Sequence, residues 1–194
     1  LIGLEADPLA LEAARVTLQG VQVELRHGDT LAEPLPEADL VLGNPPWIRV
    51  QNLDPEVRER LWARFATATD KNDISSCFVE HALAAAPRVA FVLPRNWLSL
   101  KSFHALRERV AAAGVDGLFA VPDGLFGARV QSVALLISTG FCGRSFSFWS
   151  FSSAGSHHSS LPVSRLNACS LFCTTRARVF SFTWLLLSQI CFCR

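Results

Sequence analysis

The sequence predicts an α/β fold, in which short apolar strands alternate with amphipathic helices. Apolar runs of strand length recur as far as Ser138, and helical patterns stand between them. One of these runs, Ala38 to Leu42, leads directly into Asn44-Pro45-Pro46-Trp47. From Cys142 onward the composition changes, and neither helical nor strand periodicity continues. We therefore expect the first part of the chain to carry the fold.

The expected elements follow one another as strand, helix, strand, strand, two helices, strand, helix, strand and strand. Asp7-Pro8 and Asp54-Pro55 indicate helix starts, because an Asp side chain caps a helix and Pro fits its first turn. Gly20 and Gly114 indicate helix ends. The strands are expected at Leu1–Glu5, Val21–Leu25, Ala38–Leu42, Arg88–Leu93, Gly117–Pro122 and Ser132–Ser138, and the helices at Pro8–Gly20, Asp54–Ala68, Asp73–Leu83 and Phe103–Ala113.

The turn Asn44-Pro45-Pro46-Trp47 combines groups that suit a planar amine. It follows a buried strand, and open α/β sheets bind ligands at the carboxyl ends of their strands. An amino group on a nucleobase is a poor nucleophile, because its lone pair is delocalised into the ring. The carboxamide of Asn44 and the carbonyl of Pro45 can accept its two hydrogens, while Trp47 stacks on the base. The alternative is an ordinary strand-ending turn.

Asn-Pro-Pro-aromatic after an apolar strand resembles the catalytic motif of the amino-methyltransferases that use S-adenosylmethionine, particularly the adenine-N6-specific DNA methyltransferases of restriction-modification systems. The run Asp73–Leu83 resembles the Asp-Leu-Tyr…Phe-X-Glu-X-X-Leu stretch of that family, with Ser75 in place of the aromatic residue. Pro94-Arg-Asn-Trp-Leu98 resembles its Val-Pro-X-X-Trp-Leu element. The resemblance covers roughly Leu1 to Ser138 and implies a class I methyltransferase (Rossmann-like) sheet from its second strand onward.

The resemblance also implies a cofactor site and a site for a flipped-out adenine in DNA. Glu5 matches the acid that binds the cofactor ribose, and Asp29 matches the carboxylate that accepts a hydrogen bond from the cofactor's adenine amino group. Phe126 matches a loop aromatic that stacks on the target base opposite Trp47. The methyl donor is already activated, so the chemistry requires no metal. The expected catalytic residues are Asn44, Pro45, Pro46, Trp47 and Phe126, and the expected S-adenosylmethionine-binding residues are Glu5, Ala6, Asp29 and Thr30.

Two parts of the family pattern are absent from this sequence. The first strand and its Gly-rich turn, which hold the methionine part of the cofactor, should precede Leu1. We therefore expect a sheet that lacks its first strand, in which the two flanking strands pair differently or an apolar slot stays open. We also expect the chain alone to bind S-adenosylmethionine weakly or not at all. Residues up to Phe141 hold 13 Lys and Arg against 17 Asp and Glu, without a basic stripe. We therefore expect double-stranded DNA to be bound through a target-recognition region that is missing from this sequence.

Residues 1–141 are expected to form a partial methyltransferase domain, and residues 142–194 a tail of low order that is rich in Ser, Phe, Cys and Arg. The tail holds five Arg and no acid, and out-of-frame translation explains this change together with the missing periodicity. We favour that interpretation over a zinc module, whose ligand spacings do not match, and over a membrane segment at Val179–Cys193, which is shorter than the roughly 20 residues a span needs. Cys77 is the single cysteine of the first part, which indicates a cytoplasmic, reduced protein.

Two other functions stay open at this point. Methyltransferases that act on protein glutamine or on RNA guanine also use Asn-Pro-Pro-aromatic, although the helical segment after Trp47 and the loop of Phe126 count against them. A non-catalytic DNA-binding remnant of a restriction-modification enzyme is the second possibility. The missing cofactor turn supports a remnant, and the intact Asn44-Pro45-Pro46-Trp47 counts against one.

Overall fold

The computed structural model describes residues 1–121, 131–138, 148–150 and 190–193. Its strands are β1 (Ile2–Glu5), β2 (Glu24–His27), β3 (Leu40–Gly43), β4 (Arg88–Pro94), β5 (Val115–Ala120), β6 (Ser132–Ser138), β7 (Phe148–Ser150) and β8 (Ile190–Cys193). Its α-helices are α1 (Pro8–Thr17), α2 (Pro55–Arg64), α3 (Ser75–Ala85) and α4 (His104–Ala113). Three short 3-10 helices join them: η1 (Val50–Asn52), η2 (Arg95–Leu98) and η3 (Lys101–Phe103).

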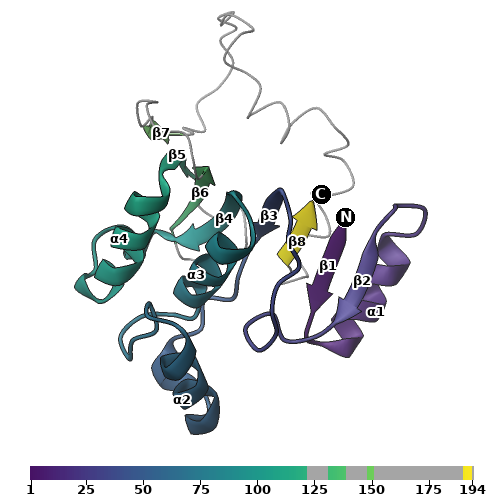
Figure 1. Cartoon of the computed structure of the whole chain (residues 1–194), viewed down its shortest axis with the longest axis horizontal. Coiled ribbons are helices and arrows are strands. Elements are labelled where there is room, and N and C mark those ends of the chain that lie inside the picture. The colour runs from purple at the N-terminus through teal and green to yellow at the C-terminus, as the bar shows by residue number, and fades with distance from the viewer. Residues whose placement is uncertain (122–130, 139–147, 151–189, 194) are drawn as a thin grey trace, which may run out of the picture.

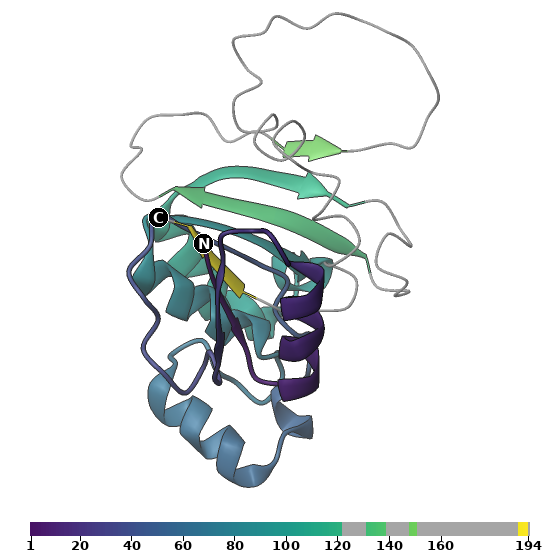
Figure 2. The same ribbon diagram turned by 90° about the vertical axis from the view of Figure 1, so that its right-hand side faces the viewer.

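The strands form one mixed sheet in the order β2-β1-β8-β3-β4-β6-β5-β7. β1 pairs in parallel with β2, β3 with β4, and β5 with β7, whereas β6 runs antiparallel to both β4 and β5. Helix α1 packs against β1 and β2, α3 against β4, and α4 against β6 (Figure 1). Figures 1 and 2 both show α2 beyond the end of the sheet toward which β1 points. The predicted α/β fold is confirmed.

Helix starts follow the sequence signals. The side chain of Asp7 accepts hydrogen bonds from the main-chain N–H groups of Leu9 and Ala10, and Pro8 occupies the first helical turn. Asp54 accepts a bond from the N–H of Glu56 in the same way. Gly114 ends α4 with a φ of 92°, a conformation that residues with a Cβ rarely adopt. The predicted starts of α1 and α2 are therefore confirmed.

Several predicted boundaries differ from the structure by two or more residues, and two of these differences have a clear physical cause. α2 ends at Arg64 rather than at Ala68, because Phe65 leaves the helix in an extended conformation and its side chain is buried. The strand predicted at Val21–Leu25 lies further along the chain, at Glu24–His27. There it pairs residue by residue with β1, whereas Val21 stays exposed. Long-range pairing with β1 therefore decided the register over the local alternation of residues.

The core lies between the central strands and helices α3 and α4. Sheet residues at the centre are almost completely buried, and so are the helix residues that face them. No helix in the described part of the chain is long and apolar enough to cross a membrane. The core side chains include Val41, Val89, Phe91, Leu93, Leu135 and Ile137 from the sheet, and Cys77, Val79, Ala82, Leu106 and Val110 from the helices.

The place between β1 and β3 is filled, although the sequence predicted either an altered pairing or an open slot. β8 lies there and runs antiparallel to both neighbours, opposite Ile2–Leu4 on one side and Leu40–Gly43 on the other (Figure 1). β7 and β8 are the parts of the tail that the structure describes, and both pair with the sheet, which the sequence did not indicate. The physical reason is that β1 and β3 each present main-chain N–H and C=O groups that need partners, and a strand of any sequence can supply them.

Candidate active site

Asn44 follows β3 at the carboxyl end of the strand, as the sequence predicts. Its side chain is half-buried, and its Oδ1 atom is buried without a hydrogen-bond partner among the described residues. Such an oxygen is unusual, because the large majority of buried polar atoms are hydrogen-bonded. Trp47 is also half-buried, and its Nε1 atom likewise has no partner in the described part of the chain. Among the described residues, the turn thus holds a side-chain acceptor and an indole N–H that make no hydrogen bond.

The chain after Trp47 is fastened to the segment that precedes α3. The N–H of Val50 donates to the carbonyl of Asn72 at 3.0 Å, and the N–H of Ile74 donates to the carbonyl of Ile48 at 2.9 Å. Arg49 and Asp73 stand opposite each other in the resulting antiparallel bridge. The position of the turn therefore depends on two main-chain hydrogen bonds to a segment more than twenty residues further on.

That segment is held by a buried network of polar side chains. Asn72, which is 1% exposed, donates through Nδ2 to the carbonyl of Thr67 and to Oγ of Ser76, and its Oδ1 accepts from the N–H of Thr69 at 3.0 Å. Ser76 Oγ also donates to the carbonyl of Asp73 at 2.9 Å. Satisfied networks of this kind fix one arrangement, since any alternative leaves buried groups unpaired.

Asp73 is buried at the N-terminal end of α3. Its Oδ1 atom accepts hydrogen bonds from the N–H and the hydroxyl of Ser75. Burial raises the pKa of Asp73 above its ordinary value, while the two bonds from Ser75 and the positive charge of Arg49 act in the opposite direction. Arg49, directly after the turn, therefore contributes charge to a buried carboxyl group.

A cavity of about 570 Å³ lies beside the turn, between the end of β1 and helix α2. All four residues predicted to bind the cofactor line it, and so does Pro46 from the turn. Asn44 and Trp47 do not line it, and Phe126 lies outside the described residues. The lining consists of Leu4, Glu5, Ala6, Asp29, Thr30, Leu31, Ala32, Pro46, Leu53, Val57, Arg60, Leu61, Ala63, Arg64, Ile74 and Phe78.

The two carboxylates of the cavity are held in different ways. Glu5 is 6% exposed; its Oε1 accepts from the N–H of Asp7 at 2.9 Å, and its Oε2 is buried without a partner among the described residues. Asp29 is exposed, and its Oδ1 accepts from the N–H of Leu31 at 2.9 Å. His27 contacts the carbonyl of Ala6 through Nε2 at 3.0 Å. An unpaired buried carboxylate oxygen beside an open cavity fits a ligand with hydroxyl groups.

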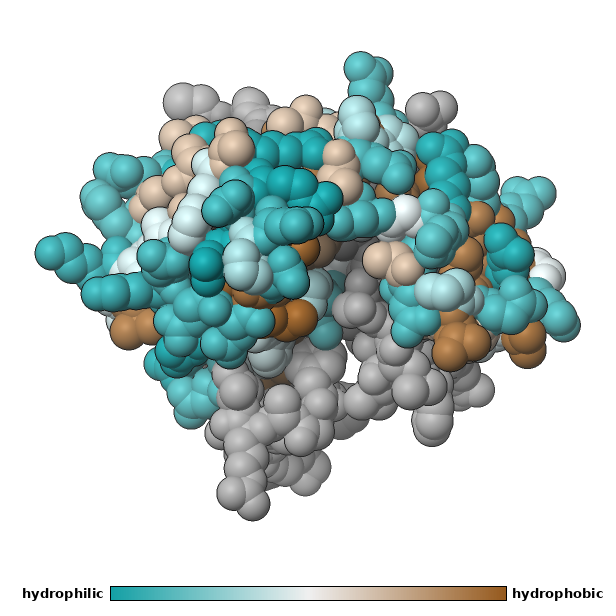
Figure 3. Space-filling model, turned by 90° about the horizontal axis from the view of Figure 1, so that it is seen from below, coloured by the Kyte–Doolittle hydropathy of each residue, from teal (hydrophilic) through white to brown (hydrophobic). Residues whose placement is uncertain are grey.

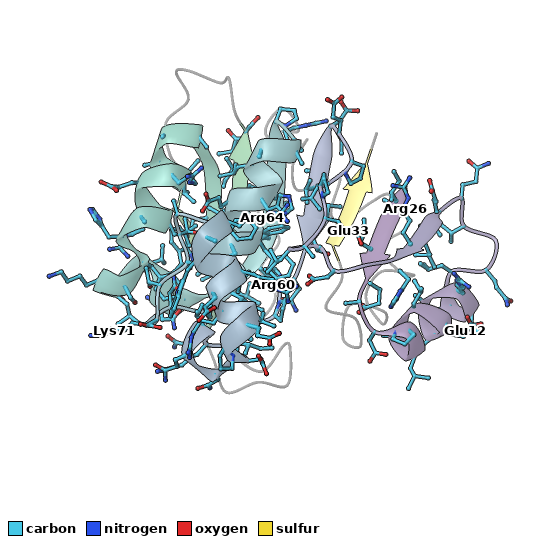
Figure 4. All side chains as sticks on the ribbon, turned by 60° about the horizontal axis from the view of Figure 1, so that its bottom comes forward. Glu12, Arg26, Glu33, Arg60, Arg64 and Lys71 are labelled. Atoms are coloured by element: carbon cyan, nitrogen blue, oxygen red, sulfur yellow. The ribbon has the colours of Figure 1, made fainter. Side chains whose placement is uncertain are left out.

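The sequence did not indicate that α2 forms one wall of this cavity. Arg60 and Arg64, which Figure 4 labels on α2, line the cavity. Val57 and Leu61 of the same helix line it too. The signal was present in the spacing of Val57 and Leu61, which are four residues apart and share one helix face. Figure 3, which views the molecule from the side of α2, shows a mostly hydrophilic face with separate hydrophobic areas.

Residues 36–113, which contain the turn and helices α2 to α4, match the family of Eco57I restriction-modification methylases. The type II methyltransferase M.TthHB8I of Thermus thermophilus is 28% identical over 158 residues, which are 76% of this chain and 35% of that protein. The type II methyltransferase M.XhoI of Xanthomonas vasicola is 32% identical over 111 residues, 55% of this chain and 20% of that protein. The chain thus spans about a third or less of the length of these curated relatives.

Solved structures with the same fold are described as methyltransferases. A Listeria monocytogenes protein described as a class I S-adenosylmethionine-dependent methyltransferase superposes with a TM-score of 0.65 at 17% identity, over 94% of this chain and 55% of that one. The methyltransferase subunit of a type I restriction-modification system from Streptococcus thermophilus gives 0.62 at 16% identity, over 95% and 47%. These likenesses establish the class I methyltransferase fold. Residues 36–113 are, in addition, similar to the Eco57I restriction-modification methylase family, and the chain is similar in sequence to type II methyltransferases.

Proposed function

We propose that this chain is the catalytic part of a restriction-modification DNA methyltransferase, which transfers a methyl group from S-adenosylmethionine to N6 of a flipped-out adenine. The observation that carries the proposal is the unpartnered, buried Oδ1 of Asn44, in a turn whose Pro46 also borders the cavity with Glu5 and Asp29. An acceptor for an amine thus stands next to a place for a cofactor. We assign residues 1–141 to the partial catalytic domain and residues 142–194 to a tail, from which β7 and β8 add strands to the sheet.

The cavity suits the adenosine part of S-adenosylmethionine. Glu5 has an unpartnered carboxylate oxygen that can accept from ribose hydroxyls, and the carboxylate of Asp29 can accept from the adenine amino group. Ala6 and Thr30 line the same side, and the apolar side chains of Leu53, Val57 and Leu61 offer a surface for the flat purine. The bound cofactor supplies a methyl group that a sulfonium already activates.

The turn would hold the target base. Oδ1 of Asn44 and the carbonyl of Pro45 accept the two hydrogens of the adenine amino group, which draws the nitrogen lone pair out of conjugation. Trp47 stacks on one face of the base, and we assign the other face to Phe126. Positioning of the two reactants and exclusion of water then supply most of the rate acceleration. The amino proton is released to solvent during or after methyl transfer.

The partner that follows from this function is double-stranded DNA, met in the cytoplasm. The first 141 residues carry an excess of acids, so most phosphate contacts would come from a target-recognition region outside them. The relatives are type II methyltransferases, which supports the assignment to a restriction-modification system.

Product analysis tests this proposal. The purified chain is incubated with methyl-labelled S-adenosylmethionine at high concentration and with duplex DNA, RNA or a glutamine-containing protein, and the products are hydrolysed and separated. We expect label in N6-methyladenine when DNA is the substrate, and no label in the RNA or the protein. Label in methylated guanine of RNA or in methylated glutamine would support the alternative methyltransferases and overturn the adenine assignment.

A further inference from the structure

Arg64 joins helix α2 by hydrogen bonds to the loop 29–33, and both segments contribute residues to the lining of the cavity. We infer that Arg64 is a positioning residue, which fastens the end of α2 to the loop 29–33 and so fixes the direction of the Asp29 carboxylate. This inference rests on the proposed function only where the ligand is named. The fastening itself is a property of the chain without ligand.

The guanidinium of Arg64 donates to two successive main-chain carbonyls of the loop. Nη1 donates to the carbonyl of Ala32, and Nη2 donates to the carbonyl of Glu33 at 3.2 Å. Figure 4 shows α2, with Arg60 and Arg64 labelled, beside the segment that carries Glu33. A planar fork with several fixed donors can serve both carbonyls at once, whereas the single ammonium group of lysine has no such geometry.

The residues that carry these two carbonyls are also bonded to Asp29 within the loop. The N–H groups of Ala32 and Glu33 both donate to the carbonyl of Asp29, at 2.9 and 3.2 Å, and the N–H of Leu31 donates to the Asp29 carboxylate. At its other end the loop is tied to β1, since the N–H of Gly28 donates to the carbonyl of Glu5 at 3.0 Å. Arg64 supplies a further attachment at the opposite end of the loop.

Arg64 is itself held in place from two sides. Its Cζ atom lies 5.4 Å from the centre of the ring of Phe65, a buried residue. Its Nη2 atom lies 3.4 Å from Nε2 of His81 on α3. Burial, followed by the charge of Arg64, lowers the pKa of His81, while the main chain of Thr30 and the charge of Glu80 oppose the shift. The lowered pKa favours the neutral ring of His81, which can accept a hydrogen bond from Arg64.

These contacts link the cofactor cavity to the turn Asn44–Trp47, which is the proposed target-base site. α2 follows the turn Asn44–Trp47 through η1, and its residues Val57 and Leu61 form the cavity wall across from Glu5. A displacement of α2, for example when a target base enters the turn, is passed through Arg64 to the loop of Asp29. Arg64 thus couples the cofactor side of the cavity to the helix that follows the target-base turn.

Hydrogen exchange on the ligand-free chain tests the positioning role directly. The variants are Arg64→Ala and Arg64→Lys, with Arg58→Lys as the matched control. Arg58 lies on the same helix, but its guanidinium stands over the ring of Trp62, 5.2 Å from the ring centre. We expect the amides of Ala32 and Glu33 to exchange about tenfold faster in Arg64→Ala, the factor that corresponds to the loss of one to two ordinary hydrogen bonds.

Arg64→Lys should show a smaller acceleration, and Arg58→Lys none at these amides. Urea unfolding of each variant separates loosening of the loop from global destabilisation, and Arg64→Lys guards against a poorly folded alanine variant. Unchanged exchange at Ala32 and Glu33 in both Arg64 variants would overturn the inference.

Adenosine serves as the probe in a second arm, with binding followed by ligand-observed NMR. We expect Arg64→Ala to weaken adenosine binding severalfold relative to Arg58→Lys. If adenosine binds to no variant, including the natural chain, while exchange accelerates in Arg64→Ala, the proposed ligand is wrong and the positioning role stands. If adenosine binds equally to all variants, Arg64 does not fix Asp29 for this ligand, and the inference fails.

Discussion

Arg49 and Asp73 stand opposite each other in the antiparallel bridge that joins the chain after Trp47 to the segment before α3. Asp73 is buried and Arg49 is exposed, so the bridge connects the surface beside the turn to the polar network inside. The candidate active site is thus supported by main-chain bonds and buried side chains that touch neither proposed ligand.

Substitution of Asn72 by Ala tests the importance of that network for the fold. The change removes the Nδ2 donor from Oγ of Ser76 and from the carbonyl of Thr67, which keeps only the 3.3 Å bond from Ser76 Oγ, and it leaves the N–H of Thr69 without its acceptor. We expect a loss of about 2 kcal/mol in the free energy of unfolding, because buried polar groups lose their partners. Urea unfolding measures it, with the exposed Asn52→Ala as the control. Equal stability of the two variants would show that the network contributes nothing.

Asp73 gives the stability of the protein a defined pH dependence. Its folded-state pKa is raised above the ordinary value of 3.8, so the folded chain binds this proton more tightly than the unfolded chain. The stabilisation that comes from this bound proton is fully present below the ordinary pKa of 3.8. It is lost as the pH rises through the folded-state pKa. Relative to Asp73→Asn, the natural chain should lose stability across this window. Urea unfolding at a series of pH values measures the difference, with the exposed Asp70→Asn as the control. A difference that does not vary with pH contradicts this account.

Cys77 should be chemically inert in the folded chain. It is completely buried, and burial, the largest cause, raises the pKa of its thiol to about 12, so the reactive thiolate is essentially absent at pH 8. We expect iodoacetamide to leave Cys77 unmodified in the native protein and to alkylate it in urea. Peptide mass spectrometry distinguishes Cys77 from the five other cysteines. Rapid native alkylation of Cys77 is the result that would speak against the packing of α3.

The pairing of β8 is tested with Cys191→Pro, since proline cannot donate to a sheet ladder and is not tolerated in a central strand. Cys191 stands opposite Gly3 of β1 and Leu42 of β3. We expect a loss of about 2 kcal/mol in the free energy of unfolding, and self-association through the freed strand edges. Cys191→Ala, which keeps the N–H group, should behave like the natural chain. Identical stability of the proline and alanine variants would exclude β8 from the sheet.

Much of the candidate site could be predicted because it depends on local patterns. An apolar run that ends in Gly43 and two prolines places Asn44 at a strand end wherever that strand lies in the sheet. Glu5 and Asp29 each follow or lie next to a parallel strand, and the carboxyl ends of parallel neighbours meet at one edge. Their common cavity was therefore predictable from strand order.

The remainder depends on long-range packing that leaves no local trace. The inward turn of Phe65 shortens α2, and the pairing with β1 shifts the strand expected at Val21. The role of Arg64 toward the carbonyls of Ala32 and Glu33 joins residues more than thirty positions apart. β8 is the extreme case, since the composition of the tail indicated no strand and only the unpaired edges of β1 and β3 account for its place.

The central claim is that Asn44 accepts hydrogens of an adenine amino group during methyl transfer. The most direct measurement compares the transfer of labelled methyl groups to N6 of adenine in duplex DNA by the natural chain and by Asn44→Ala, with Asn52→Ala as the matched control. At a high concentration of S-adenosylmethionine, which offsets the weak cofactor binding expected of this chain, we predict measurable transfer by the natural chain and by Asn52→Ala. We predict a loss of at least about a hundredfold in Asn44→Ala, since removal of one preorganised catalytic hydrogen-bonding group has this effect in other enzymes. Transfer by Asn44→Ala at the rate of the natural chain would contradict the claim.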